Sequence, residues 1–262
     1  SHMLISVDAN ASPADTLNAW NRIQALRTRV MNGEDFETVA RSKGGSEDPS
    51  VTSNGGDLGW FTAFQMVYPF ENAAFNTAEG EVSDIVRTRF GYHILKVNGK
   101  RKARGEVQVA HIMVRMPKDA PQDQVANAEG RIMEVKRMLM SGESFESMAM
   151  KYSEDPSTAN KGGMLPWFGT GKMVEAFEDA AFAMDEPGDI TGPVRTDYGF
   201  HILKLIDKKT LPTLEESRRE LSKKVRRDSR ADITKTSFVN KLKQEYSTTV
   251  SSRRLEALKV AA

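Results

Sequence analysis

The 262-residue sequence has no cysteine, no long apolar run and only four histidines, and each scarcity removes a class of protein. Without cysteine there is no disulfide, thiolate-bound zinc, iron–sulfur cluster or cysteine nucleophile. No stretch approaches the ~18 apolar residues of a transmembrane helix, so no membrane insertion is expected. The first residues also lack the basic and apolar regions of a secretory signal.

Signatures of nucleotide, hydrolase and metal sites are missing as well. There is no phosphate-binding Gly-x-x-x-x-Gly-Lys-[Ser/Thr] loop, no Gly-x-Gly-x-x-Gly turn after a strand and no Gly-x-Ser-x-Gly elbow. The histidines do not have His-Glu-x-x-His spacing, and no cysteine can complete a zinc site. We therefore expect no metal and no cofactor.

The charge is balanced overall but unevenly distributed. The formal net charge is +1, which gives no global field for nucleic acid. Residues 207–262, however, contain 15 Lys and Arg against 8 Asp and Glu, a net of +7. A basic C-terminal tail thus follows an acidic body.

Five short segments occur twice, 107 to 109 residues apart. They are Gly33–Glu37 and Gly142–Glu146, Ser46–Ser50 and Ser153–Ser157, Gly55–Phe61 and Gly162–Phe168, Phe70–Phe75 and Phe177–Phe182, and Phe90–Lys96 and Tyr198–Lys204. Such a period is too long for a solenoid and indicates a duplicated domain. We predict a first copy at residues 1–103, a second copy at 104–208 and a basic helical segment at 209–262.

Both copies share one predicted order of elements. An apolar strand (2–7 or 107–114) precedes a long helix, which Ser12 and Pro13 can start in the first copy and Pro121 in the second. A shorter helix follows near Asp35 or Ser144. Then come a short strand at Trp60 or Trp167, a helix and two closing strands, with the last strands half-buried. The pattern predicts an α+β fold with helices packed on a four-stranded antiparallel sheet in each copy.

Each copy has one histidine at the start of its first strand and one in its last strand. These pairs are His2 with His93 and His111 with His201. Adjacent strands can bring each pair together, although hydrogen-bonded core histidines are the commoner outcome. Each copy also repeats an Asp, Asp48 or Asp155, and an apolar trio whose pattern alone fits ordinary core packing. The trios are Leu58, Met66 and Phe70, and Leu165, Met173 and Phe177.

The ordered series of repeated motifs resembles the parvulin-type peptidyl-prolyl isomerases over residues 1–206. The first copy carries SEDPS, GGDLGWF, PFENAAF and FGYHILKV, and the second carries AHIMV, SEDPS, FEDAAF and YGFHILKL. Two such domains in one chain are similar to the SurA-like periplasmic folding factors. The resemblance implies two FKBP-like domains, a periplasmic location and proline-containing unfolded polypeptides as clients.

The resemblance also assigns roles to the repeated residues. It implies a catalytic network of His111, Asp155 and His201, matched by His2, Asp48 and His93. It implies a proline pocket of Leu165, Met173 and Phe177, matched by Leu58, Met66 and Phe70. With the resemblance, a functional role becomes the favoured interpretation for both the histidine pairs and the apolar trios, in place of core packing.

The first copy departs from the pattern in two places. Ala63-Phe64 replaces the Thr170-Gly171 turn, which is expected to narrow or reshape the mouth of its pocket. Ser1-His2-Met3 also matches residues that an expression vector leaves behind, so the origin of His2 stays open. In the second copy, Met164 and Pro166 replace Asp57 and Gly59. We expect the second copy to be the more active one.

Two functions fit this reading. One is catalysis of X–Pro isomerisation in unfolded or newly exported polypeptides, with chaperone activity; the other is a non-catalytic chaperone that holds extended clients on parvulin folds. A preference for phosphorylated Ser–Pro needs clustered cations beside the pocket. The loop at 8–12 has none, and the corresponding second loop has only Arg115 and Lys118. We predict no strong preference for phosphate.

The basic tail has a helical pattern of its own. Thr213 with Glu216 resembles a capping box, and apolar residues recur from Leu221 to Tyr246. One interpretation is a helix that docks on the acidic body; the alternative is an arm that holds clients or closes a dimer. No aromatic stacking pattern supports a nucleic-acid partner.

Overall fold

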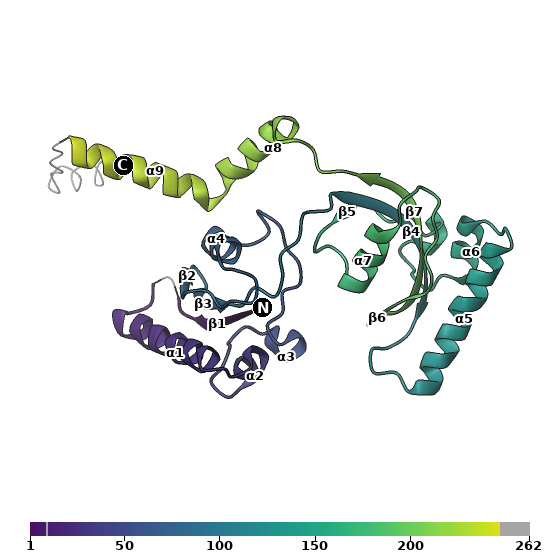
Figure 1. Cartoon of the computed structure of the whole chain (residues 1–262), viewed down its shortest axis with the longest axis horizontal. Helices are drawn as coiled ribbons and strands as arrows, with labels where there is room; N and C mark the ends of the chain where they lie inside the picture. The colour runs from purple at the N-terminus through teal and green to yellow at the C-terminus, as the bar shows by residue number, and fades with distance from the viewer. Residues whose placement is uncertain (9, 247–262) are drawn as a thin grey trace, which may run out of the picture. The chain divides into compact units, whose positions relative to one another are not determined.

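The computed structural model describes residues 1–8 and 10–246 (Figure 1). The chain divides into two compact units, Ser1–Thr213 and Leu214–Ala262. The first unit contains both copies of the repeat, and the second contains the basic tail.

The first copy has a three-stranded antiparallel sheet in the order β1-β3-β2. Its elements are β1 (His2–Ser6), α1 (Pro13–Met31), α2 (Phe36–Arg41), α3 (Val51–Asn54), α4 (Tyr68–Asn76), β2 (Val86–Thr88) and β3 (Gly91–Leu95). The second copy has a four-stranded antiparallel sheet in the order β5-β4-β7-β6. Its elements are β4 (Glu106–Arg115), α5 (Gln122–Met140), α6 (Phe145–Tyr152), the 3-10 turn η1 (Ala159–Lys161), β5 (Phe168–Gly169), α7 (Glu175–Ala183), β6 (Val194–Thr196) and β7 (Gly199–Lys209). The predicted α+β class is confirmed.

The predicted fourth strand forms only in the second copy. There, β5 pairs with Glu106 and Val107 at the start of β4. The prediction of a strand at Trp60 is wrong, because no strand among the described residues pairs with the segment around Trp60. A strand needs a partner for its backbone groups.

Local sequence signals start the helices as predicted. The Ser12 side chain accepts a hydrogen bond from Asp15 N, and Pro13 occupies the first turn of α1. Asp35 caps α2 and Ser144 caps α6 in the same way. Along α1, Ile23 and Leu26 lie on the buried side, and Leu17 and Trp20 lie on the exposed side.

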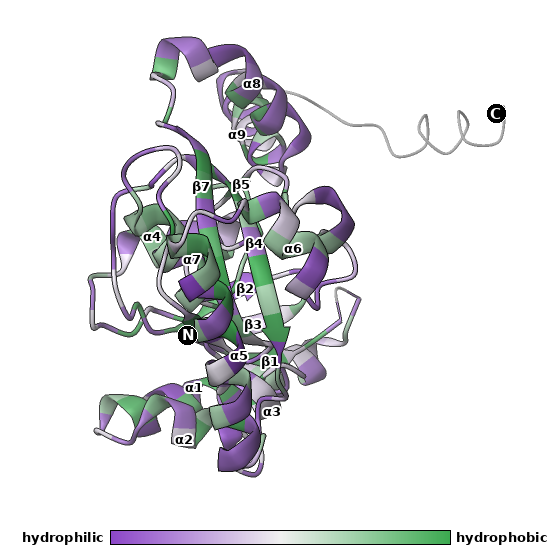
Figure 2. Cartoon of the chain, turned by 90° about the vertical axis from the view of Figure 1, so that its right-hand side faces the viewer, coloured by the Kyte–Doolittle hydropathy of each residue, from purple (hydrophilic) through white to green (hydrophobic). Residues whose placement is uncertain are grey.

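Alternation along the central strands separates the core from the candidate site. In β4, Ala110, Ile112 and Val114 pack against α5 and α6, whereas Val107 and Val109 pack on the face covered by α7. His111 has the same parity as Val107 and Val109 and therefore points toward α7. The central strands β4 and β7 are largely apolar (Figure 2). Over most of β7 the side chains on both faces are buried, so this strand is more buried than the half-buried strand predicted from the sequence.

The basic tail forms two helices, α8 (Leu214–Arg227) and α9 (Ser229–Glu245). They are separated at Asp228, whose carboxylate accepts a hydrogen bond from Arg230 N and starts α9. α8 begins directly after Thr213, as the capping pattern predicts. No described residue of either helix is buried. Docking on the acidic body and dimer closure both stay predictions.

Candidate functional site

The two histidines of the second copy meet on neighbouring strands. Met113 of β4 is opposite His201 of β7, and His111 is opposite Leu203, so the histidines are diagonal neighbours on one face. Their rings are stacked with centroids 5.7 Å apart at 13°. Both side chains are buried, and their Nδ1 atoms are 3.4 Å apart. The predicted pairing of His111 and His201 is confirmed.

A continuous chain of hydrogen bonds passes through this pair. His111 Nε2 is 2.9 Å from Asp155 Oδ2, and His201 Nε2 is 2.8 Å from Thr196 Oγ1. One proton assignment is consistent with these contacts: Thr196 donates to His201 Nε2, His201 Nδ1 donates to His111 Nδ1, and His111 Nε2 donates to Asp155. Thr158 also donates to Asp155 and lies 3.1 Å from His111 Nε2.

Burial and hydrogen bonding set the charges in this network. Burial, reinforced by the neighbouring His111, lowers the pKa of His201 to about 4, so its ring is neutral at pH 7. Burial opposes ionisation of Asp155, but hydrogen bonds from Thr158, Ser157 and His111 outweigh it and lower the pKa of that carboxyl. The network therefore holds an ionised acceptor beside a neutral imidazole at physiological pH.

The apolar trio of the second copy forms the wall of an open pocket. Phe177 is buried, and its ring meets His111 and His201 edge-on with centroids 5.7 and 5.4 Å away. Leu165 and Met173 are half-buried. All six residues predicted for this copy line one pocket of about 680 Å³: His111, Asp155, Leu165, Met173, Phe177 and His201. The apolar side chains and the histidine–aspartate network thus line the same solvent-accessible pocket.

The first copy repeats the stacking of the rings but lacks several of the hydrogen bonds. His2 and His93 stack at 5.8 Å and 18°, and Phe70 meets both rings edge-on. His2 Nε2 is 3.2 Å from Asp48 Oδ2 but lacks the alignment of a hydrogen bond. Within the described residues, the Nδ1 atoms of His2 and His93 have no hydrogen-bond partner.

The pKa values of the first pair also fall. Burial lowers the pKa of His2, although nearby Asp48 partly offsets it. Burial and then the His2 ring lower the pKa of His93 to about 4. Both shifts favour neutral rings.

Two residues of the first copy's apolar trio line a pocket whose lining includes neither histidine. Leu58 and Phe70 line this pocket of about 340 Å³, whose lining includes none of His2, Asp48, His93 or Met66. Met66 is half-buried outside that lining. Phe70 lies between this pocket and the histidine pair, because it lines the pocket and its ring meets both His2 and His93 edge-on.

Several residues of the site were not predicted. Thr88 and Thr196 bind the Nε2 atoms of His93 and His201. The repeated Val-Arg-Thr, which places a threonine five residues before each histidine, was a usable signal. Thr158 has no such signal, because Val51 occupies the matching position in the first copy. Its contact with Asp155 becomes evident only in the folded loop.

A buried glutamate supports the turn at the pocket mouth in each copy. Glu178 accepts from Gly171 N at 2.8 Å and pairs with Arg104 at 2.7 Å, while Glu71 accepts from Phe64 N at 2.6 Å. Phe64 adopts φ +69°, close to the φ +77° of Gly171. The expected change at this turn therefore lies in the added side chain, because the left-handed backbone is retained.

The structure offers no sign of a metal or a membrane span in the parts it describes. Residues 1–8 and 10–246 contain no group of three or more metal-binding side chains. No helix in those ranges has the length and apolar character needed to cross a bilayer.

Comparison with known proteins agrees with the repeat. The PPIC-type PPIase (rotamase) domain matches residues 2–99 and 111–207. The Chaperone SurA of Chromohalobacter salexigens is 32% identical over 226 residues, which are 84% of this chain and 50% of the relative. That of Nitrosococcus oceani is 28% identical over 249 residues, 93% of this chain and 57% of the relative. The chain thus spans about half the length of the curated relatives it matches.

Among solved structures, the peptidylprolyl isomerase PrsA from Bacillus cereus is 34% identical, with a TM-score of 0.38 and coverage of 56% of this chain and 53% of that chain. The assignment depends on the domain match, which covers most of the sequence in two consecutive blocks. The chain belongs to the PPIC-type peptidyl-prolyl isomerase, or rotamase, family and contains its domain twice.

Proposed function

We propose that this chain catalyses cis–trans isomerisation of X–Pro bonds in unfolded polypeptides, chiefly through its second copy. The supporting observation is that the second copy places an apolar wall and a complete His–His–Asp network on one open pocket. The domain match supports the same activity.

The chemistry requires rotation and no bond cleavage. The X–Pro amide rotates over a barrier of roughly 18–20 kcal/mol because resonance resists twisting. Leu165, Met173 and Phe177 would hold the proline ring and exclude water from the amide. A twisted amide is less dipolar than a planar one, so a dry apolar wall favours the twisted state over the ground state.

The polar network would shape this wall and orient the substrate amide. Rotation about the amide breaks no bond and so requires no proton transfer, and His201 can remain neutral throughout at pH 7. The two imidazoles hold the Phe177 ring edge-on, and Asp155 fixes the orientation of His111. Preorganised dipoles of this kind cost no rearrangement when the amide twists.

A second candidate function is client holding without catalysis. The relatives are named Chaperone SurA, and the Nδ1 atoms of both histidines of the first copy have no hydrogen-bond partner among the described residues. We propose that the first copy contributes client binding more than rotation. We also propose a periplasmic location, domain limits at 1–103, 104–208 and 209–262, and a basic tail that acts as a docking helix or as a client or dimer arm.

The test is a protease-coupled prolyl-peptide assay on the full chain with paired variants. Met173→Glu places a charge on the proposed proline wall, and Met66→Glu places it at the matching, half-buried position of the first copy. We expect Met173→Glu to reduce kcat/KM about tenfold or more, since an unpaired charge desolvated by substrate is costly, and Met66→Glu to retain most activity.

Aggregation of an unfolded client separates the two functions. If the wild-type chain suppresses aggregation but neither it nor Met66→Glu accelerates isomerisation, catalysis is refuted and client holding stands. If Met173→Glu loses isomerisation and keeps suppression, both functions are present and reside at different surfaces.

A further inference from the structure

The turn at the mouth of the second copy's pocket is held by the first copy as well as by its own. Residues 170–174 connect β5 to α7 and include Met173, which lines the pocket. Gln65 of the first copy donates through Nε2 to Thr170 O at 3.0 Å. The Oε1 atom of Gln65 accepts from Thr62 N at 2.7 Å, so both ends of this amide are bound. The first copy therefore contacts the backbone of this turn directly.

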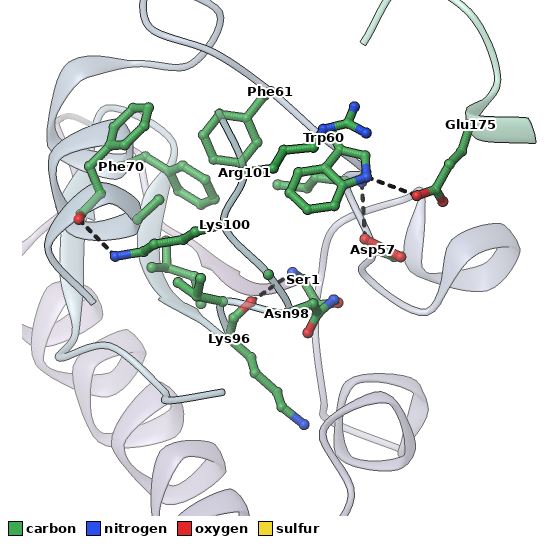
Figure 3. Close-up of a pocket in the computed structure, with 17 residues that line it drawn as sticks. Ser1, Asp57, Trp60, Phe61, Phe70, Lys96, Asn98, Lys100, Arg101 and Glu175 are labelled. Atoms are coloured by element: carbon green, nitrogen blue, oxygen red, sulfur yellow. Dashed lines mark hydrogen bonds between the residues drawn. The ribbon is translucent and has the colours of Figure 1, made fainter. Parts of the chain in front are cut away.

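A second contact lies at the other end of the turn, where α7 begins (Figure 3). Trp60 Nε1 donates to Glu175 Oε1 at 2.8 Å. Glu175 follows Met173 by two residues and precedes Phe177 by two, and both of these residues line the pocket. The indole N–H of Trp60 thus binds the segment between two residues of the proposed proline wall.

Gly171 lies against the backbone of the first copy. A Cβ at this position would be 2.6 Å from Trp60 O, which is closer than a real Cβ atom approaches a backbone oxygen. Phe64 occupies the matching position of the first copy with φ +69°, close to the φ +77° of Gly171. The left-handed conformation alone therefore does not require glycine, whereas the Trp60 carbonyl leaves no room for a side chain at position 171.

Arg101 connects these contacts to the buried carboxylate behind the turn. Its guanidinium carbon lies 4.2 Å from the centroid of the Trp60 ring (Figure 3), and it donates to Glu178 at 2.9 Å and to Asp179 at 3.1 Å. The Glu178 side chain is only 3% exposed and accepts from Gly171 N through its other oxygen. A guanidinium held between an aromatic face and a buried carboxylate has little freedom to move. The contacts from Trp60 to the turn therefore form one connected set.

The equivalent tryptophan of the second copy lacks the corresponding contact. Trp167 matches Trp60 in the repeat, is likewise half-buried, and has the cation of Lys209 3.7 Å from its ring centroid. Its indole N–H makes no hydrogen bond within residues 1–8 and 10–246. Trp167 is therefore a matched control for Trp60, and it lies in the copy that carries the complete histidine network.

We propose that Trp60 and Gln65 of the first copy are positioning residues for the proline wall of the second copy. They hold the turn that includes Met173, so a loop of one copy supports the pocket of the other. The inference rests on the proposed isomerase function, since the wall is defined by the proline that it would hold. Isomerisation by the second copy should therefore suffer more from a change in the first copy than from the same change in its own tryptophan.

The first test makes the same substitution in each copy of the full chain. Trp60→Phe keeps an aromatic ring but removes the donor to Glu175, whereas Trp167→Phe removes an indole that makes no such bond. In the protease-coupled assay, Trp60→Phe should lower kcat/KM about threefold to fivefold, and Trp167→Phe should leave it within about twofold of wild type. Hydrogen exchange by mass spectrometry should be faster across residues 169–175 in Trp60→Phe alone.

Two substitutions of Gln65 separate positioning from packing. Gln65→Glu keeps the length of the side chain and an acceptor for Thr62 N, but it places a carboxylate against Thr170 O. Gln65→Lys supplies a donor again, and Lys172 already occupies the matching position in the second copy. Gln65→Glu should lower kcat/KM about fivefold, and Gln65→Lys should retain most of the activity. Packing alone would make these two variants alike.

Circular dichroism and thermal unfolding establish that each variant is folded, and the Gln65 pair decides the question if Trp60→Phe does not fold. Unchanged activity of a folded Trp60→Phe variant would overturn the inference. So would an equal loss in Trp167→Phe, or a loss without faster exchange across residues 169–175. If the wild-type chain does not accelerate isomerisation, the proposed function fails, while the exchange of residues 169–175 still shows whether the first copy holds the turn.

Discussion

His111 Nδ1 and His201 Nδ1 lie 3.4 Å apart between stacked rings, and this contact joins Asp155 to Thr196 through two imidazoles. In the first copy the rings of His2 and His93 stack at nearly the same distance, yet both Nδ1 atoms lack a partner among the described residues. The duplication has therefore preserved the ring positions better than the hydrogen bonds between them.

Replacing Thr158 by Val, the residue found at position 51, tests the importance of this difference. The change removes the hydroxyl that donates to Asp155 and contacts His111 Nε2. Loss of one such bond should lower kcat/KM about threefold to tenfold without unfolding the protein. The reciprocal Val51→Thr variant is the control, and it should leave total isomerisation nearly unchanged. Equal activity of Thr158→Val and wild type would remove Thr158 from the network.

Acid should destabilise the protein before its carboxylates titrate. The pKa of His201 falls from 6.5 to about 4 on folding, so between these values the unfolded chain binds the additional proton. The stabilisation by neutral His201 is complete above pH 6.5 and declines as pH falls toward 4, by at most about 1.4 kcal/mol per pH unit. His93 follows the same direction.

Guanidinium unfolding at a series of pH values measures this effect. The free energy of unfolding should fall as pH decreases through the window, and His201→Gln should show a shallower fall than wild type. A wild-type free energy that is constant across the window would contradict buried, neutral histidines.

The sequence predicted most of the architecture because strong local signals specify it. The caps at Ser12, Asp35 and Ser144 and the alternation of the central strands are each readable without tertiary information. The strand at Trp60 could not be excluded in this way, since strand formation there depends on a distant partner. The exposure of Trp20 could not be predicted from its spacing in the helix either, because a helix can expose apolar residues at the edge of its buried face.

The site was predicted to a similar extent. The repeat and the family resemblance indicated His111, His201 and Phe177, which the fold brings together. Thr158 could not be found, since a hydroxyl bound to Asp155 within a loop follows no periodicity.

Gly163 should be indispensable for the position of His111. It has φ +80°, and a Cβ there would lie 2.2 Å from His111 O. Gly163→Ala should therefore displace the start of the site and reduce isomerisation strongly. Gly188→Ala is a matched control, because φ is +101° but no atom lies within 4 Å of the added Cβ. Similar losses in both variants would mean that backbone strain alone, and not the contact with His111, sets the effect.

Phosphorylation of the residue before proline should bring little gain. Lys118 is paired with Asp197 at 2.8 Å, which leaves Arg115 and Lys172 as the cations lining the pocket of the second copy. Without a cluster that can grip a phosphate, we expect phosphoserine–proline to be turned over within about threefold of alanine–proline. A much larger gain in matched peptides would show a phosphate site that this arrangement does not provide.

The most direct test of the central claim is the cis–trans exchange rate of an Ala–Pro peptide, measured by NMR with the full chain present. Phe177→Ala deletes the ring that contacts both histidines of the second copy, and Phe70→Ala deletes the corresponding ring in the first copy. Circular dichroism and fluorescence establish that each variant remains folded. We expect the catalysed cis–trans exchange rate to fall close to the uncatalysed rate with Phe177→Ala and to stay near the wild-type rate with Phe70→Ala. Persistence in a folded Phe177→Ala variant, or equal loss in both, would contradict catalysis centred on the second copy.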